Sequence, residues 1–230
     1  MGSGETTKGT HQPTARQASR TTTLIVVCIA QFLTVLDFQS ITVALPSIQA
    51  AFNIAPATLQ WLISAQALAF GGLLLLTGRT TNLVGRRRSF VIGLALFGVG
   101  AVMCALAPSV IVMIVGRIVQ GVAAAIITPA ALSLLSATYA EGRERTFALG
   151  VWGAVAPIGG SVGIVLGGWL IGQFGWPWIF WLTVPIVLVA LVLSRLLEGG
   201  DREASGHLDI WGAVLGTLAV TFLVYGLSEI

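Results

Sequence analysis

The chain has 230 residues, of which 56% are hydrophobic and only 9% carry a charge, whereas a soluble domain has roughly 25% charged residues. So little charge cannot cover a soluble globule with polar surface, which excludes the soluble classes and indicates an integral membrane protein. The net charge of +3 does not indicate a nucleic-acid partner, because the basic residues are not gathered on one face with interleaved aromatic residues.

Seven apolar runs follow one another along the chain, each close to the roughly 20 residues that an α-helix needs to cross a membrane. They are Leu24–Leu45, Ala57–Gly78, Ser89–Ala107, Val110–Ser136, Phe147–Ile171, Trp178–Ser194 and Trp211–Ser228. Where no charge separates two runs, turn residues do so, at 46–56, 107–109 and 172–177. The runs lack the alternating pattern of a membrane β-barrel, so the predicted fold is all-α.

These runs divide the chain into four segments. We expect residues 1–22, which are polar and rich in Gly, Ser and Thr, to form a disordered cytoplasmic tail. Residues 23–197 are predicted to form a six-helix bundle, residues 198–209 a cytoplasmic linker, and residues 210–230 a seventh transmembrane helix. The tail is no signal peptide, because the first apolar run is too long and no small-residue cleavage site follows it.

Apart from Arg117, lysine and arginine are confined to the N-terminal tail and to some of the connections between the runs. They occur in the tail and in 79–88, 139–146 and 195–209, whereas the other three connections contain none. By the positive-inside rule the basic connections face the cytoplasm. We therefore expect a multi-pass protein of the cell membrane with a cytoplasmic N-terminus, and seven spans place the C-terminus outside.

Two charged residues remain at membrane depth, Asp37 in the first run and Arg117 in the fourth. A charge at the centre of a span costs about 2.5–3.5 kcal/mol on insertion scales, so such residues usually pair or face a water-filled cavity. Either a functional site or an ion pair that only holds helices together fits this pattern.

A second pattern is the spacing of Gly159, Gly163 and Gly167, which share one helical face that a neighbouring helix can approach closely. Ordinary helix packing and a moving hinge both remain open for these glycines.

Four stretches are similar to the signature motifs of one family. Leu36–Pro46 (LDFQSITVALP) resembles LDxTIVNVALP, Gly78–Arg88 resembles GxLaDrxGrr, Gly116–Gly121 with Thr128–Ala130 resembles RxxQG…P, and Gly159–Gly168 resembles GxxxGPxxGG. On these motifs the chain resembles the major facilitator superfamily, in its fourteen-span drug:proton antiporter branch. The resemblance implies a major-facilitator-type six-helix N-terminal bundle plus one further transmembrane helix. It also implies a secondary active transporter that exports amphipathic drugs or other organic compounds against protons, with no cofactor.

The resemblance further implies roles for individual residues. Asp37 and Arg117 would couple transport to protons, because the arginine tunes the proton affinity of the nearby carboxylate, and Gln120 extends this polar patch on the fourth span. Two groups would move: a cytoplasmic gating loop (Gly78, Asn82, Gly85, Arg86, Arg87) and an antiporter-motif helix that shapes the hinge (Pro157, Gly159, Gly163, Gly167, Gly168).

The chain departs from these motifs at four positions. Asn82 stands where the loop motif has Asp, and Ile164 replaces the Pro of the fifth-span motif. Thr42 replaces Asn in the first-span signature, and Pro177 stands where the branch shows Arg. These changes leave the expected fold intact and bear on transport activity.

Length is the largest departure from the family. Such transporters pack two six-helix halves around a central cavity, and this chain supplies the first half and one connecting helix. We expect a truncated transporter that alone moves nothing vectorially. Its expected partners are a small organic substrate, protons, the lipid bilayer, and the missing C-terminal half or a second copy, with no nucleic acid. Candidate cavity-lining residues are the uncharged Gln31, Gln39, Gln60 and Gln66.

Other classes fit less well. A facilitator-type uptake carrier for a small metabolite shares the fold, and a non-transporting truncated membrane protein also remains open. A G-protein-type receptor would have its N-terminus outside, and a retinal protein needs a lysine in its last helix, whereas the single lysine is Lys8. An enzyme or ATP-driven pump is disfavoured, because no Gly-rich phosphate loop with Lys and no metal-ligating cluster is present. Cys28 and Cys104 lie in apolar runs and offer no disulfide framework.

Overall fold

The computed structural model describes residues 13–197, and side chains from residue 19 onwards apart from 75, 79, 80, 82 and 83. This part of the chain forms six α-helices: α1 (Pro13–Phe52), α2 (Pro56–Val84), α3 (Arg86–Ala105), α4 (Val110–Thr138), α5 (Arg143–Phe174) and α6 (Pro177–Ser194). Each of them contains a stretch long and apolar enough to cross a membrane, which confirms the all-α membrane fold. The predicted linker 198–209 and seventh helix 210–230 lie outside the described residues.

Helix α1 is longer than predicted at its N-terminal end. Its first residue is Pro13, so residues 13–22, which we expected in a disordered tail, are helical. Proline at the first helical position is already in the required φ range. Contacts at Arg20 also hold this part of α1 against the rest of the bundle. Arg20 Nη1 lies 3.1 Å from Glu144 Oε2, and the Tyr139 hydroxyl donates to the Arg20 carbonyl oxygen at 3.0 Å.

At the other end, α1 continues through Pro46, which we expected in a turn, and ends at Phe52. Proline removes one backbone donor, but transmembrane helices tolerate it where neighbouring groups satisfy the freed carbonyl. The helix stops at Asn53, whose φ of 48° lies in the left-handed region that Asn adopts more readily than most residues. Helix α2 then begins at Pro56.

The expected gating loop between the second and third spans is mostly helical. Helix α2 runs through Gly78 and Asn82 to Val84, and α3 begins at Arg86. The sequence prediction of a loop over these residues was therefore wrong, because a single glycine such as Gly78 weakens a helix without ending it. A φ of 97° at Gly85 reverses the chain within a single residue, a conformation that residues with a Cβ rarely adopt.

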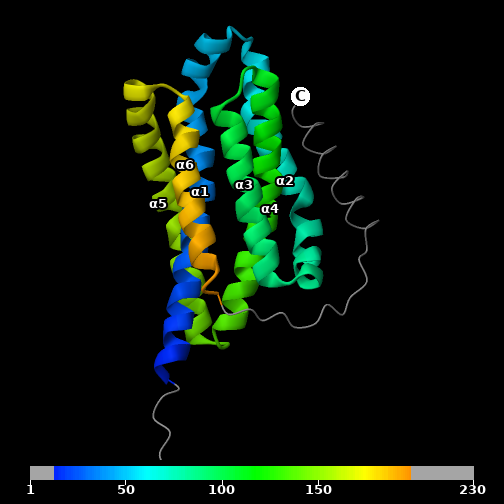
Figure 1. Cartoon of the computed structure of the whole chain (residues 1–230), viewed down its shortest axis with the longest axis vertical. Coiled ribbons are helices and arrows are strands. Elements are labelled where there is room, and N and C mark those ends of the chain that lie inside the picture. The colour runs from blue at the N-terminus through cyan, green and yellow to red at the C-terminus, as the bar shows by residue number, and fades with distance from the viewer. Residues whose placement is uncertain (1–12, 198–230) are drawn as a thin grey trace, which may run out of the picture.

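The six helices form two groups of three (Figure 1). Helices α5, α1 and α6 lie side by side, as do α2, α4 and α3, and the two groups meet through contacts of α3 with α6 and of α1 with α4. Helices α1, α2 and α3 correspond in order to α4, α5 and α6. Under this correspondence the contact of α1 with α5 matches the contact of α4 with α2. This is the arrangement expected of two three-helix repeats that pack onto each other.

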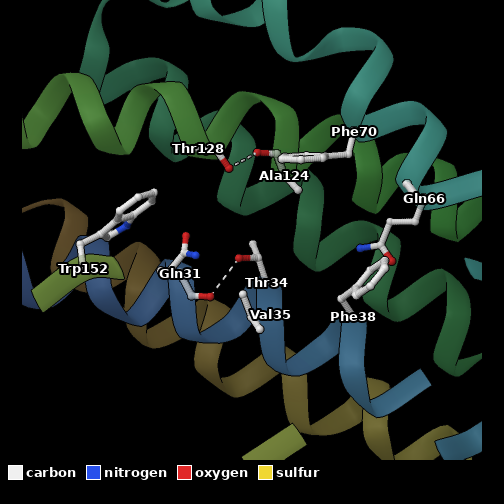
Figure 2. Close-up of a pocket in the computed structure, with 10 residues that line it drawn as sticks. Gln31, Thr34, Val35, Phe38, Gln66, Phe70, Ala124, Thr128 and Trp152 are labelled. Atoms are coloured by element: carbon white, nitrogen blue, oxygen red, sulfur yellow. Dashed lines mark hydrogen bonds between the residues drawn. The ribbon is translucent and has the colours of Figure 1, made fainter. Parts of the chain in front are cut away.

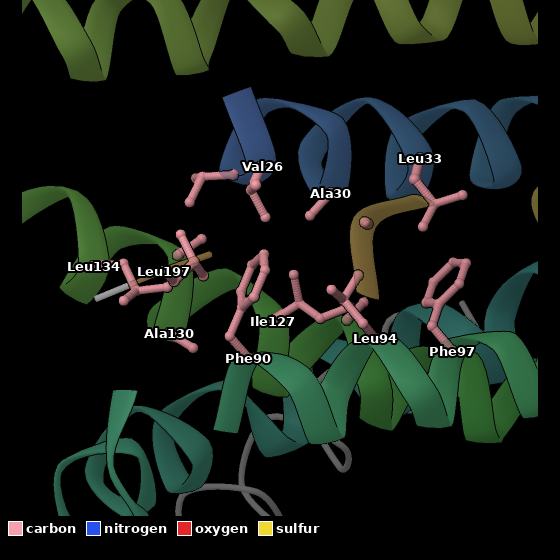
Figure 3. Packing of buried hydrophobic residues seen from close by; sticks show 14 of the residues in the cluster. Val26, Ala30, Leu33, Phe90, Leu94, Phe97, Ile127, Ala130, Leu134 and Leu197 are labelled. Atoms are coloured by element: carbon pink, nitrogen blue, oxygen red, sulfur yellow. The ribbon is translucent and has the colours of Figure 1, made fainter. Parts of the chain in front are cut away.

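Apolar side chains fill the space between α1, α3 and α4 (Figure 3). Val26, Ala30 and Leu33 of α1 face a row of side chains on α3 and α4 that are fully or almost fully buried: Phe90, Leu94, Phe97, Ile127 and Ala130. Small residues let the backbones of α3 and α4 approach, since a Cβ on Gly100 would lie 2.9 Å from the Gly116 carbonyl oxygen. Such close fit stabilises membrane helix pairs, for which lipid offers no hydrophobic driving force.

Candidate proton-coupling site and substrate cavity

The two charged residues predicted at membrane depth form an ion pair. Arg117 Nη1 of α4 lies 2.7 Å from Asp37 Oδ2 of α1, and only 2% of Asp37 and none of Arg117 is exposed. Gln120, one helical turn beyond Arg117, donates from Nε2 to Asp37 Oδ1 at 2.9 Å and accepts from Arg117 Nη1 at 3.0 Å. Both carboxylate oxygens are therefore occupied by residues of a single turn of α4.

Other helices complete the surroundings of Arg117. Its Nε donates to the Leu62 carbonyl oxygen of α2 at 3.1 Å, and Cys104 Sγ of α3 lies 3.9 Å from Gln120 Oε1. Arg117 Nη2 is buried without a hydrogen-bond partner among the described residues. The sequence left open whether Asp37 and Arg117 pair with each other or face a water-filled cavity, and the structure shows that they pair. The sequence did not indicate Leu62 and Cys104, whose contributions come from a backbone carbonyl and an apolar run.

This arrangement makes the contact between α1 and α4 depend on charge. A buried ion pair is stable only while both partners are present, because an uncompensated buried charge is strongly destabilising. A proton on Asp37 would cancel its charge and remove the attraction to Arg117, whereas Arg117 would keep its bonds to Leu62 and Gln120. The ion pair is thus one contribution to the contact of α1 with α4, beside the apolar packing of the two helices.

The glycine face of α5 packs against the same helix α1. A Cβ on Gly159 would lie 3.0 Å from the Phe32 carbonyl oxygen, one on Gly163 would lie 2.6 Å from that of Leu36, and one on Gly167 would lie 3.2 Å from Ser40. The predicted close approach of a neighbouring helix is confirmed, and that helix is α1. The Ser40 hydroxyl also donates to the Gly163 carbonyl oxygen at 3.0 Å.

The remaining residues of the antiporter motif lie on the same helix but pack less tightly. A Cβ on Gly168 would make an ordinary contact of 3.6 Å with Val43. Pro157 lies inside α5, where the Ser161 hydroxyl donates to its carbonyl oxygen at 3.0 Å. The local structure requires glycine at 159, 163 and 167 more than at 168.

The arginines of the predicted gating loop stand at the first turn of α3. Arg87 reaches the end of α6, where its Nε donates to the Ser194 carbonyl oxygen at 3.2 Å and its Nη2 to that of Arg195 at 3.0 Å. Arg86 is half-buried beside it. Gly78, within α2, faces Pro129 of α4, since a Cβ there would lie 3.9 Å from the Pro129 Cβ.

A cavity of about 320 Å³ opens between α1, α2, α4 and α5 (Figure 2). It is lined by amide, hydroxyl, aromatic and aliphatic side chains: Gln31, Thr34, Val35, Phe38, Gln66, Ala67, Phe70, Ala124, Thr128 and Trp152. None of these ten residues is charged. Gln66 Oε1 and Trp152 Nε1 are buried without hydrogen-bond partners among the described residues, and Gln31, Thr34 and Thr128 add further amide and hydroxyl groups to the lining.

Two of the four predicted cavity glutamines, Gln31 and Gln66, line this cavity, whereas Gln39 and Gln60 do not. Gln39 lies instead against Gly160 on the α1–α5 contact, and Gln60 is an exposed residue in the first turns of α2. Amide chemistry alone therefore does not identify the cavity. The spacing of Gln31, Thr34, Val35 and Phe38 does carry a usable signal, because these positions share one helical face.

Comparisons with known proteins agree with this architecture. Residues 27–227 match the profile of the Major Facilitator Superfamily. The chain belongs to this superfamily. It is 41% identical over 219 residues to the cephamycin export protein CmcT of Amycolatopsis lactamdurans, covering 94% of this chain and 45% of CmcT. It is 40% identical to the puromycin resistance protein pur8 of Streptomyces alboniger, covering 90% of this chain and 41% of pur8.

A solved structure gives the same fold. A bacterial homologue of the human lysosomal transporter Spinster, in an inward-facing and unoccupied conformation, superposes with a TM-score of 0.59 at 20% identity, covering 84% of this chain and 46% of that one. The chain spans less than half the length of these relatives. It therefore corresponds to one part of each of them.

Proposed function

We propose that the chain forms the N-terminal half of a proton-coupled exporter of amphipathic organic compounds. The observation that carries this proposal is the buried cluster of Asp37, Arg117 and Gln120, which joins the two helices α1 and α4. Both helices also line the cavity. A proton that cancels the charge of Asp37 would release α1 from α4 and so change the walls of the compartment that holds the substrate.

The cavity supports an amphipathic substrate. Its aromatic residues Phe38, Phe70 and Trp152 offer apolar surface, and its amides and hydroxyls offer hydrogen bonds without charge. Relatives named for cephamycin export, puromycin resistance and lincomycin resistance favour compounds of this kind and favour export over uptake. Alternating access needs two bundles that move around a shared site, so a C-terminal half would supply the opposite wall.

In this proposal the close contact of α5 with α1 is the hinge, and the turn at Gly85 is the cytoplasmic gate. Gly159, Gly163 and Gly167 let the α1 backbone lie directly against α5, because glycine has no side chain to separate the two helices. The arginine-rich helix ends face the cytoplasm, as the positive-inside rule requires.

A chimera tests the proposal. In the chimera, this chain replaces the matching N-terminal part of pur8, and puromycin resistance is measured in cells that produce it. Cells that produce residues 1–230 alone are the control, and we expect this control to confer no resistance. We expect the chimera to exclude puromycin in a manner dependent on the pH gradient, and Asp37→Asn to abolish this while still inserting. A fully active Asp37→Asn chimera would remove the coupling role, and gradient-driven accumulation of the compound would favour an uptake carrier. A second chimera, built in the same way on CmcT, shows why an inactive pur8 chimera fails. Activity of the CmcT chimera would mean that the two halves of the pur8 chimera do not fit each other, whereas inactivity of both chimeras would mean that this N-terminal half is inactive.

A further inference from the structure

A basic groove lies between α3 and α6, away from the substrate cavity. Its volume is about 650 Å³, and Arg87, Arg88 and Arg195 line it together with aliphatic side chains of both helices. Helix α3 begins at Arg86 and α6 ends at Ser194, so all three arginines gather at one end of the groove. We propose that this groove binds an anionic phospholipid of the surrounding membrane.

Hydrogen bonds hold the guanidinium of Arg87 in place at this end of the groove. Arg87 donates to the carbonyl oxygens of Ser194 and Arg195 at 3.2 and 3.0 Å, and because these acceptors are uncharged the guanidinium keeps its full positive charge. The same bonds hold the end of α6 against the start of α3. Arg195 lines the groove at this joint, and Arg88 follows Arg87 directly along α3.

The wall beyond the arginines is apolar and exposed. Ile92 of α3 is 52% exposed, and Leu188 and Val192 of α6 are 56% and 62% exposed. Ile92 lies one helical turn beyond Arg88, and Val192 lies three residues before Arg195, so both helices present the same order from charge to hydrocarbon. A phospholipid has this order too, with a charged headgroup at the membrane surface and chains that run parallel to the helices.

A phospholipid matches the whole groove, whereas a free anion matches only its end. Inorganic phosphate would use the arginines and leave the aliphatic wall uncovered, and a zwitterionic lipid would cover the wall but gain little from three cations. Basic pockets between membrane helices at the cytoplasmic surface are suited to anionic headgroups. The attraction of each arginine near such a surface corresponds to about a fivefold change in affinity.

The test compares dioleoylphosphatidylglycerol with dioleoylphosphatidylcholine, which share their chains and differ in headgroup charge. The full chain is purified in a nonionic detergent, and native mass spectrometry measures the lipids that it retains. We expect preferential retention of phosphatidylglycerol, and Arg88→Gln with Arg195→Gln should weaken its binding by about 25-fold, five for each arginine, while phosphatidylcholine is unaffected. Arg143→Gln is the matched control, because Arg143 is an exposed arginine at the first turn of α5 and does not line the groove.

Three further arms make the outcome decisive. Arg88→Lys with Arg195→Lys keeps the charge and should bind as the wild type does, which separates charge loss from misfolding. Val192→Trp fills the wall and should also weaken phosphatidylglycerol binding. The proposal is wrong if Arg143→Gln weakens binding as much as the double glutamine variant, if Val192→Trp has no effect, or if an equal concentration of inorganic phosphate displaces the lipid.

Discussion

Arg117 and Asp37 are 80 positions apart in the chain, yet Arg117 Nη1 lies 2.7 Å from Asp37 Oδ2 in a site that solvent hardly reaches. We predict that Asp37→Asn destabilises the bundle by about 3–5 kcal/mol, because it leaves the arginine as an uncompensated buried charge. Thermal unfolding in detergent, followed by circular dichroism, measures the loss. Asp37→Asn combined with Arg117→Gln should recover much of it, and an unchanged midpoint in the single variant would show that the pair contributes nothing.

The α1–α5 contact gives a second prediction. Gly163→Ala should destabilise the protein by about 1–3 kcal/mol, the usual range for overpacking, because the new Cβ would lie 2.6 Å from the Leu36 carbonyl oxygen. Gly153→Ala on the same helix is the control, since nothing lies within 4 Å of its Cβ position, and alanine there should be neutral or slightly stabilising. Equal midpoints for the two variants in thermal unfolding would contradict a tight contact at Gly163.

Arg87 gives a third prediction, about the joint between α3 and α6. Arg87→Gln removes two hydrogen bonds from a charged group to backbone carbonyls, and hydrogen bonds of this kind contribute about 1.5–3 kcal/mol each. We expect a lower unfolding midpoint and faster proteolysis near residue 195. Arg87→Lys should recover only part of the loss, because lysine lacks the planar fork that reaches two carbonyls. Full recovery with lysine would mean that charge alone matters at this joint.

Membrane orientation gives a fourth prediction. Ala51 and Gln173 are exposed near one end of the bundle, and Glu141 is exposed near the other. In a background with Cys28 and Cys104 replaced by alanine, single cysteines at Ala51 and Gln173 should react with an impermeant maleimide added outside intact cells. A cysteine at Glu141 should react only after the membrane is opened. Outside labelling at Glu141 would reverse the proposed topology.

Much of the fold was readable from the sequence, because spans are set by length and hydropathy. The ends of the helices were harder to predict, because α1 continues beyond Pro46 and α2 continues beyond Gly78. Hydropathy indicates which residues lie in the membrane, but a helix can extend past them. The pairing of Asp37 with Arg117 was one of two possibilities that the sequence left open, because no other charge lies at that depth to act as a partner. The sequence did not predict that α1 is the helix that packs against the glycine face of α5. The spacing of the glycines shows that α5 has such a face, but it does not show which helix covers it.

The separation of Asp37 from Arg117 has a consequence for biosynthesis. At about 5–20 residues per second, the chain grows from Asp37 to Arg117, 80 positions later, in about 4–16 s. During that time the first helix enters the membrane before its counter-ion has been made, and an unpaired charge at membrane depth is costly. The ion pair that joins α1 to α4 can form only when the fourth helix arrives. The first three helices are therefore inserted before the charge of Asp37 has its partner.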